Sequence, residues 1–109
     1  MPVANAKGIG VLAMKTFAFG ALTDSNVADP IDMLHYSMSL PVSVVITGMP
    51  TMPRLQQALT AAKTFKPMTQ DQIASLLAKS KDLAADGHLE KFKTSEYFDG
   101  TSHNPEWLA

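Results

Sequence analysis

The sequence contains no cysteine, which excludes disulfide bonds, cysteine-ligated zinc and a thiol nucleophile. It also lacks an excess of charge, because nine basic and ten acidic residues leave a net charge of −1. Nucleic acids and anionic membranes attract proteins through clustered positive charge, so we expect neither as a partner. The longest apolar runs are far shorter than the roughly 18 residues of a transmembrane candidate, and the first residues do not resemble a signal peptide. We therefore expect a cytoplasmic protein.

Charged residues are scarce, at 17% of the chain, against about 25% in an average soluble domain. Hydrophobic residues account for 46%. More of the surface than usual must therefore be buried or face a partner. The 109 residues are too few for a complete (β/α)8 barrel, which needs roughly 250, so we treat residues 1–109 as a single segment.

Two apolar segments predict strands, with a helix between them. Residues 8–14 form a continuous apolar run, which is typical of a strand covered on both faces and predicts a strand over residues 8–15. Residues 42–47 are rich in β-branched side chains. Between them, Asp29 precedes Pro30 as an N-cap, which predicts a helix over residues 29–40. A strand, a helix and a strand in this order predict a right-handed parallel βαβ unit and hence an α/β fold.

Two further helices and a tail follow. Apolar side chains at helical spacing predict a helix over residues 51–64, and Thr69 with Gln72 forms a capping box that opens a helix over residues 69–86. Residues 88–109 show no period and predict an irregular, extended tail. The side chains expected to face the core are Ile31, Leu34, Met38, Leu55, Ala58, Leu59, Ala62, Phe65, Ile73, Leu76, Leu77 and Leu83. Two strands alone leave both sheet edges open, so these elements lack partners.

Candidate catalytic and metal-binding residues are few. The histidines His35, His88 and His103 are far apart in the sequence and have no carboxylates at ligand spacing, so we assign them no metal site and no catalytic triad. They fit surface or capping roles. The chain also lacks a P-loop and a Gly-x-Gly-x-x-Gly motif after a strand, so neither phosphate-binding motif is present.

The strand ends carry the residues that suggest a ligand, because ligands of α/β folds bind outside the carboxyl ends of the strands. Lys15 follows the first strand there, and it fits either a cation facing an anionic ligand or a lysine that turns into solvent. Residues 48–51 join the second strand to a helix start, and Arg54 lies one turn inside that helix. Backbone amides and the helix dipole suit an anion at such a junction, although an ordinary βα turn fits the same residues.

Three segments in this order resemble the carboxyl-terminal third of an aldo/keto reductase: KGIGVLAMK at residues 7–15, MLHYSMSLPVSVVITGM at residues 33–49 and FKPMT at residues 65–69. The closing residues 92–107 resemble the tails of one bacterial subgroup of that family. The resemblance implies a partial (β/α)8 TIM barrel whose seventh and eighth strands are the two parallel strands, with three helices and an irregular tail. It also implies an oxidoreductase that transfers hydride between NADP(H) or NAD(H) and a small carbonyl substrate.

The resemblance implies cofactor-binding residues at the end of the first strand. Lys15, Thr16 and Phe17 fall in the loop that covers the cofactor pyrophosphate in the family. Met14 falls where many members place an aromatic side chain against the nicotinamide. These residues would form one side of the dinucleotide site.

The resemblance implies a second set of cofactor-binding residues after the second strand. Gly48 and Met49 occupy the position of a common Lys-Ser pair, and Thr51 opens the helix that follows. Arg54 matches an arginine near the adenosine phosphate, and Gln57 stands where a glutamate is common. Because the lysine of the pair is absent, the choice between NADP(H) and NAD(H) stays open.

The family's acid catalysis uses an Asp, a Tyr, a Lys and a His from its first four strands, to which nothing in this sequence corresponds. We therefore assign no catalytic residue and expect the chain by itself to reduce no carbonyl substrate. The alternative is a stand-alone small α/β module that binds a ligand or another protein and covers its sheet edges by forming a homo-oligomer. Some members of the bacterial subgroup carry export signals, so the resemblance leaves export of a full-length parent open beside the expected cytoplasmic location.

Overall fold

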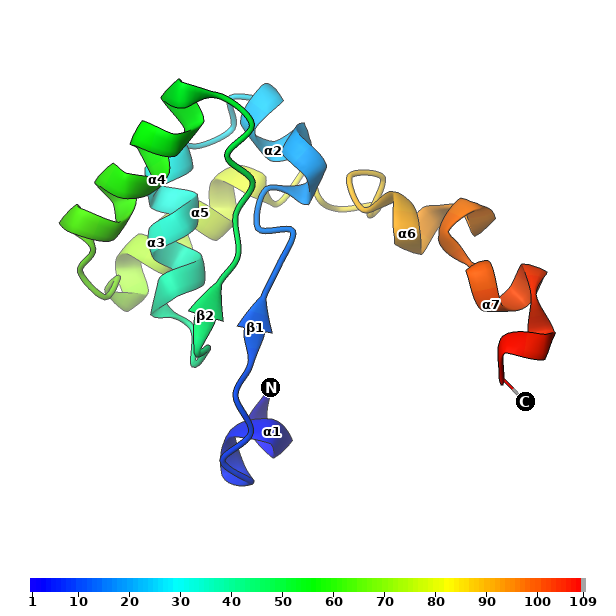
Figure 1. Ribbon diagram of the computed structural model, residues 1–109. Coiled ribbons are helices and arrows are strands. Elements are labelled where there is room, and N and C mark those ends of the chain that lie inside the picture. Colours follow the sequence, from blue (N-terminus) through cyan, green and yellow to red (C-terminus); the bar gives the residue numbers. More distant parts are fainter. Residues whose placement is uncertain (109) are drawn as a thin grey trace.

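The computed structural model describes residues 1–108, except for the side chains at positions 92, 93, 98 and 108, so the last residue of the predicted tail lies outside the described residues. Two short parallel strands lie beside a group of helices, and a separate arm extends from them at the carboxyl end (Figure 1). In chain order, the elements are α1 (Pro2–Ala6), β1 (Leu12–Ala13), η1 (Ala18–Gly20), α2 (Ala21–Asp24), α3 (Pro30–Ser39), β2 (Val44–Val45), α4 (Met52–Thr64), α5 (Gln70–Ser80), α6 (Lys91–Thr94), η2 (Glu96–Phe98), α7 (Gly100–His103) and η3 (Pro105–Leu108).

The strands β1 and β2 pair in parallel, with Leu12 opposite Val44 and Ala13 opposite Val45. The amide of Ile46 donates to the carbonyl oxygen of Ala13 at 2.7 Å, which continues the pairing beyond β2. Because α3 connects the two strands, the predicted order of strand, helix and parallel strand is confirmed, and the fold is mixed α/β.

The strands predicted over residues 8–15 and 42–47 are wrong in length, since each observed strand has two residues. A ladder requires a neighbouring strand about 5 Å away, and within the described chain each strand pairs only with the other. At the end of the first segment, Lys15 adopts a φ of 60°, which turns the backbone out of the extended conformation. The number of residues that pair with a neighbouring strand sets the length of a strand. The periodicity of one segment does not reveal that number.

The starts of the long helices follow the predicted capping residues. The Asp29 carboxylate accepts a hydrogen bond from the amide of Ile31 at 2.7 Å, and α3 begins at the next residue, Pro30. Thr69 and Gln72 form the predicted capping box at the start of α5. These side chains satisfy amides that have no partner within the helix, so local sequence is enough to fix where each helix begins.

The helix predicted over residues 69–86 ends earlier, at Ser80. Residues 81–86 continue as turns and reach Gly87, whose φ of +74° ends the segment. A helix gains most of its stability from packing an apolar face, and Leu83 is the only leucine between residues 81 and 86. The capping pattern therefore predicted the start of α5 correctly, while packing determined its end.

The buried apolar residues Met33, Leu34, Ala61 and Leu76 come from α3, α4 and α5, and α3 contacts both other helices. The His35 ring adds a polar contact between α3 and α4, because its Nε2 lies 3.0 Å from the carbonyl oxygen of Ala61. The small side chain of Ala61, which is 1% exposed, fills the place where α4 meets α3. This contact between three helices is the core of the described chain.

Part of the predicted core is exposed. Leu59, Ala62 and Leu77 face solvent, although their spacing predicts a buried position. The helix α4 turns Ala61 toward α3, which places Ala62 outside the contact because neighbouring helix residues point about 100° apart. The remaining predicted residues Ile31, Met38, Leu55, Ala58, Phe65, Ile73 and Leu83 are half-buried, while Leu34 and Leu76 are buried as predicted.

One face of the strand pair is uncovered. The side chains of Leu12, Met14, Val44 and Ile46 are exposed, whereas Ala13 and Val45 between them are half-buried. Side chains alternate between the two faces of a strand, so the exposed set shares one face, which we call the open sheet face. The prediction that the first strand is covered on both faces is therefore wrong for the described structure, in which no further strand or helix covers that face.

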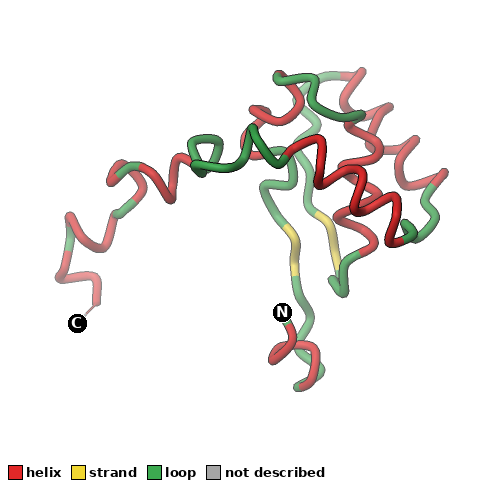
Figure 2. Tube along the Cα trace, turned by 180° about the vertical axis from the view of Figure 1, so that it is seen from behind, coloured by secondary structure: helices red, strands yellow, loops and turns green. Residues whose placement is uncertain are grey.

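The extended tail predicted over residues 88–109 is wrong from residue 91 onward. Residues 91–108 form the short helical turns α6, η2, α7 and η3, which lead away from the other helices as an arm (Figure 2). Hydrogen bonds between residues three or four positions apart close these turns, such as that from the Ser95 amide to the Lys91 carbonyl at 2.9 Å. Short helical turns can form without apolar residues at helical spacing, so the lack of hydrophobic periodicity in the tail did not reveal them.

The arm and the open sheet face enlarge the molecule. The radius of gyration is 16.0 Å, against about 13 Å for a compact domain of this length. The accessible surface is 7856 Å², against roughly 5,900 Å² for a compact protein of this mass. The chain therefore exposes about 2,000 Å² more than a self-contained domain would.

Candidate functional site

The carboxyl ends of β1 and β2 lie at the same edge of the sheet, because the strands are parallel. In Figure 1 both strands run toward α2 and the first turn of α4. The chain leaves β1 through Met14 and Lys15, and it leaves β2 through Ile46 and Thr47. The two predicted groups of ligand-binding residues therefore start from neighbouring points of the fold.

A hollow of about 330 Å³ opens at these strand ends, between the segment after β1 and the start of α4. We call it the strand-end hollow. Its lining residues are Lys15, Thr16, Phe17, Phe19, Gly20, Thr23, Asp24, Ile46, Thr47, Gly48, Pro50 and Arg54. The hollow thus brings together side chains that lie more than 30 positions apart in the sequence.

The structure gathers five of the predicted residues in this hollow: Lys15, Thr16, Phe17, Gly48 and Arg54. They come from both strand ends, which is the arrangement that the strand-end rule predicts. Their assignment to a cofactor stays a prediction.

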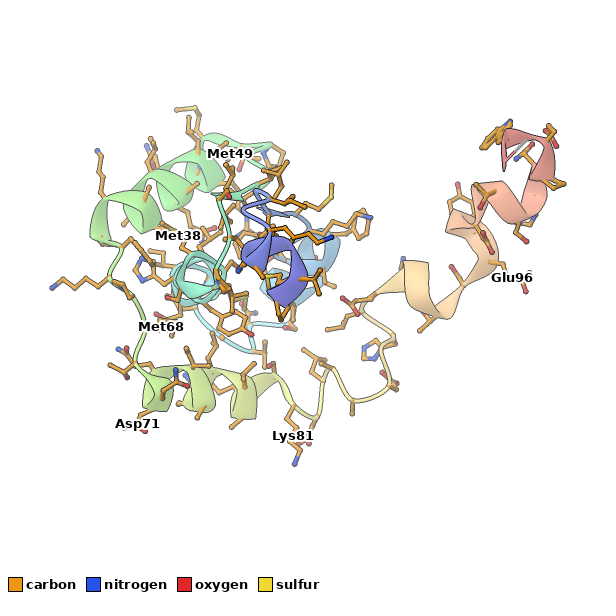
Figure 3. The ribbon with its side chains drawn as sticks, turned by 90° about the horizontal axis from the view of Figure 1, so that it is seen from below. Met38, Met49, Met68, Asp71, Lys81 and Glu96 are labelled. Carbon is orange, nitrogen blue, oxygen red and sulfur yellow. The ribbon has the colours of Figure 1, made fainter. Side chains whose placement is uncertain are left out.

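The predicted residues Met14, Met49, Thr51 and Gln57 do not line the hollow. Met14 is 63% exposed on the open sheet face, and Met49, labelled in Figure 3, is exposed just before α4. Thr51 caps α4 by accepting a hydrogen bond from the Arg54 amide at 3.5 Å. Gln57 accepts a hydrogen bond from the Arg54 guanidinium at 3.1 Å. Thr51 and Gln57 therefore contact Arg54 without lining the hollow.

The hollow carries more positive than negative charge. Its lining includes the cations Lys15 and Arg54 and one carboxylate, Asp24. The Lys15 ammonium group lies over the Phe19 ring, 4.6 Å from the ring centre, which is a cation–π contact. A concave surface with excess positive charge favours an anionic ligand.

The backbone after β1 is strained where it borders the hollow. Lys15, Ala18 and Phe19 have φ values of 60°, 47° and 58°, in the left-handed region that residues other than glycine rarely adopt. Each such residue costs of order 1–3 kcal/mol, and strain of this kind concentrates at functional sites. The turn formed by η1 and α2 fixes this conformation, since the Thr23 hydroxyl donates to the Gly20 carbonyl at 2.7 Å.

The first turn of α4 offers few amides to an anion. Pro50 and Pro53 have no N–H group, and the Arg54 amide is bonded to Thr51. The anion site predicted from helix amides at residues 48–51 therefore has fewer donors than a typical helix start. Charge in the hollow comes mainly from the side chains of Lys15 and Arg54.

Two hydroxyl groups beside the hollow are buried without a hydrogen-bond partner in the described part of the chain, those of Thr16 and Thr47. Both residues line the hollow, one after each strand. A buried hydroxyl without a partner costs about 1–3 kcal/mol, so the two threonines add a local cost at the strand ends. Thr47 was not among the predicted residues, although it directly follows the second predicted strand and the strand-end rule applies to it. Phe19 was not among them either, because no sequence pattern marks it.

A second, larger cavity of about 530 Å³ lies between β1, α3, α5 and residues 84–90. Met14 and Tyr36 are among its lining residues, which are mostly apolar. Of the two tyrosines, Tyr36 thus belongs to this cavity, and Tyr97 is exposed in the arm. Neither tyrosine lines the strand-end hollow.

The histidines bond to nearby groups, and no cluster of metal-ligating side chains occurs among the described residues. His35 contacts the Ala61 carbonyl, and His103 Nε2 lies 3.2 Å from the Glu96 carbonyl oxygen. His88 is bonded through its amide and its ring to the Asp86 carboxylate, and these bonds hold the pKa of Asp86 below its usual value. Each histidine therefore has a structural contact that accounts for it.

No protein-family model matches this chain, and neither a curated protein nor a solved structure matches it. No helix in the part of the chain that the structure describes is long and apolar enough to span a bilayer. The chain is a mixed α/β structure with a hollow at the carboxyl ends of its two parallel strands.

Proposed function

We propose that this chain is the carboxyl-terminal part of an aldo/keto reductase and binds the phosphate groups of NADP(H) or NAD(H). In this proposal β1 and β2 are the seventh and eighth strands of a (β/α)8 barrel. The observation that carries it is the strand-end hollow, where Lys15 and Arg54 meet from the two strand ends. Barrels of parallel strands bind their ligands at this end, and the excess positive charge suits a dinucleotide phosphate.

The open sheet face and the large accessible surface support the proposal that the two strands belong to a barrel. In a closed barrel, further strands pair with both edges of the β1–β2 pair and side chains fill the interior. The open sheet face presents apolar side chains of the kind that fill such an interior, among them Leu12 and Val44. An excess of about 2,000 Å² of surface and a charged share of 17% are also what a part of a larger core would have.

The residues of the hollow would hold the cofactor and shield it from water. Arg54 and Lys15 offer charged N–H donors to phosphate oxygens. The ring of Phe17 lines the same wall. The bound cofactor supplies the hydride that reduces a carbonyl carbon.

A titration with NADPH tests the site. Arg54→Ala should weaken binding about 10- to 100-fold, because a charged donor to a phosphate contributes about 1.5–3 kcal/mol. Lys63→Ala is the matched control, since Lys63 is an exposed cation in the last turn of the same helix. The change in NADPH fluorescence on binding measures both. Equal affinity of Arg54→Ala and the unsubstituted chain would remove Arg54 from the site and with it the main support for the proposal.

The proposal also predicts that the chain by itself reduces no carbonyl compound, because no proton donor of the family's catalytic set is assigned in it. The consumption of NADPH in the presence of aldehydes and ketones, followed by absorbance, should equal the rate without protein. Turnover by the purified chain, lost in Arg54→Ala, would show that the catalytic group lies within these 109 residues.

A homo-oligomeric binding module is the second candidate, and the open sheet face is the observation that favours it. A second copy on this face would cover the exposed side chains of Leu12, Met14, Val44 and Ile46, and it would need further contacts to reach the about 800 Å² per partner of a standard stable interface. Light scattering on a size-exclusion column separates the candidates. A defined oligomer with a cooperative melt favours the module, whereas an expanded, dye-binding chain favours a part of a larger barrel.

A further inference from the structure

The Phe19 side chain is a large apolar group that gains little from burial. It is 62% exposed, and it lines the strand-end hollow together with Lys15. The backbone of Phe19 has a φ of 58°, in the left-handed region that residues other than glycine rarely adopt. Neither the burial of the ring nor the preference of the backbone therefore explains why an aromatic residue stands at this position.

Hydrogen bonds of the surrounding turn hold the backbone on both sides of Phe19. The Ala18 amide donates to the Lys15 carbonyl oxygen at 2.9 Å. The Gly20 amide donates to the Phe17 carbonyl oxygen at the same distance. A ligand that contacts the Phe19 ring therefore meets a turn that is already ordered, which lowers the entropy lost on binding.

One face of the Phe19 ring is in contact with a cation. The Lys15 ammonium group lies over the ring, 4.6 Å from its centre. An aromatic ring has two faces, and stacking on an aromatic side chain is a common way for proteins to hold a nucleotide base. The hollow thus offers the cations Lys15 and Arg54 for phosphate groups and an exposed ring for a base.

A dinucleotide cofactor contains two flat rings, and their charges differ. The oxidised nicotinamide ring carries a positive charge, which the Lys15 ammonium group beside Phe19 would repel. Adenine is neutral in both redox states of the cofactor, and its two fused rings offer a larger face for stacking. The charge beside Phe19 therefore favours adenine.

We propose that Phe19 stacks on the adenine ring of a dinucleotide whose phosphate groups lie at Lys15 and Arg54 in the strand-end hollow. The inference rests on the proposed function, because it assumes that the hollow binds NADP(H) or NAD(H). It assigns a binding role to a residue that the sequence did not single out, and it places adenine at the turn after β1.

The decisive variant is Phe19→Leu, which removes the aromatic ring and keeps an apolar side chain. ADP, inorganic pyrophosphate and nicotinamide mononucleotide each displace NADPH in a competition titration, and the fluorescence of NADPH measures the affinity of each competitor. We expect Phe19→Leu to weaken ADP binding about fivefold or more, as expected when a stacked base loses its aromatic partner. The affinities for pyrophosphate and nicotinamide mononucleotide should change less than about twofold.

Two further variants serve as controls. Phe19→Tyr keeps the aromatic ring and should bind ADP within about twofold of the unsubstituted chain. Tyr97→Leu removes an exposed aromatic ring from the arm, outside the hollow, and should leave all three affinities unchanged. Circular dichroism melts compare the folding of each variant. If Phe19→Leu is less folded, the ratio of its affinities for ADP and pyrophosphate decides, because that ratio does not depend on the folded fraction.

The outcomes separate this inference from the proposed function. If the unsubstituted chain does not bind NADPH, or if pyrophosphate does not displace it, the proposed function fails and the inference fails with it. If Phe19→Leu binds ADP as well as the unsubstituted chain does, only the inference fails. It also fails if ADP and pyrophosphate lose affinity equally, because Phe19 then acts on the phosphate groups through Lys15. A loss confined to nicotinamide mononucleotide would place the other ring of the cofactor at Phe19 and overturn the assignment to adenine.

Discussion

The helical body formed by α3, α4 and α5 and the carboxyl-terminal arm of residues 91–108 are stabilised in different ways. Among the side chains that the structure describes, the four buried apolar ones lie in the body, including Leu34 and Ala61, whereas Tyr97 and Trp107 in the arm are 86% and 65% exposed. Both regions contain capped helical turns and local hydrogen bonds. The difference teaches that local bonds are enough to shape a turn, while a buried apolar contact is needed to fix one helix against another.

The largest effect should follow from Leu34→Ala. Leu34 is 3% exposed in the centre of the body, so its truncation should lower the free energy of unfolding by about 2–5 kcal/mol. Ending the chain at Glu90 removes the whole arm. This truncation should lower the free energy of unfolding by less than about 0.5 kcal/mol, because the arm adds no buried apolar residue to the described core. Urea unfolding measures both. A loss after truncation as large as that of Leu34→Ala would mean that the arm packs on the body.

Two histidines allow the same comparison for polar contacts. His35→Leu should cost about 1–3 kcal/mol, because it leaves the Ala61 carbonyl in the α3–α4 contact without its partner. His103→Leu removes a similar bond to the Glu96 carbonyl in the exposed arm and should cost less than about 0.5 kcal/mol. Thermal melts of the two variants at neutral pH compare them directly, and equal losses would contradict the distinction between body and arm.

A pair of capping aspartates sharpens the comparison further. Asp29→Ala removes the cap of α3 and should cost about 1 kcal/mol. Asp99 caps the four-residue helix α7 in the arm, where its carboxylate accepts from the Ser102 amide at 3.4 Å. Asp99→Ala should leave global unfolding unchanged and affect only hydrogen exchange of the arm amides. A shift of the global melt by Asp99→Ala would count against an independent arm.

The smallest effect concerns pH at the junction between body and arm. Hydrogen bonds from the His88 amide and ring hold the pKa of Asp86 below its ordinary value of 3.8. The unfolded chain therefore binds a proton more readily, so the small stabilisation is complete above pH 3.8 and is lost as the pH falls through the lowered pKa. Because Asp86 is exposed, the change should be visible only as a slight local shift. NMR titration of residues 86–88 measures it, and Asp86→Asn should abolish it.

The sequence predicted the features that depend on near neighbours. Asp29 with Pro30 and Thr69 with Gln72 placed two helix starts correctly, because a cap is completed within three residues. The sequence did not predict burial correctly where it depends on contact with a distant segment. Leu59 and Leu77 fit a helical apolar face yet remain exposed, since no other element of the described chain covers them enough to bury them.

The candidate site was predictable to a similar extent. The strand-end rule places Lys15 and Arg54 near one edge, and the hollow confirms that they meet there. The turn of Phe19 under the Lys15 ammonium group depends on three positive φ angles that no sequence pattern announces. The contact between Arg54 and Gln57 depends on rotamers, which helical spacing permits without requiring.

The sequence by itself thus determined the order of elements, the helix starts and the residues that follow each strand, because these depend on local hydrogen bonds and on periodicity. Tertiary structure alone decided the length of β1 and β2, which side of α4 is buried, the open sheet face and the meeting of Lys15 with Arg54. The physical reason is that ladder pairing, burial and the shape of a hollow are properties of two segments at once, and periodicity within one segment carries no information about its partner.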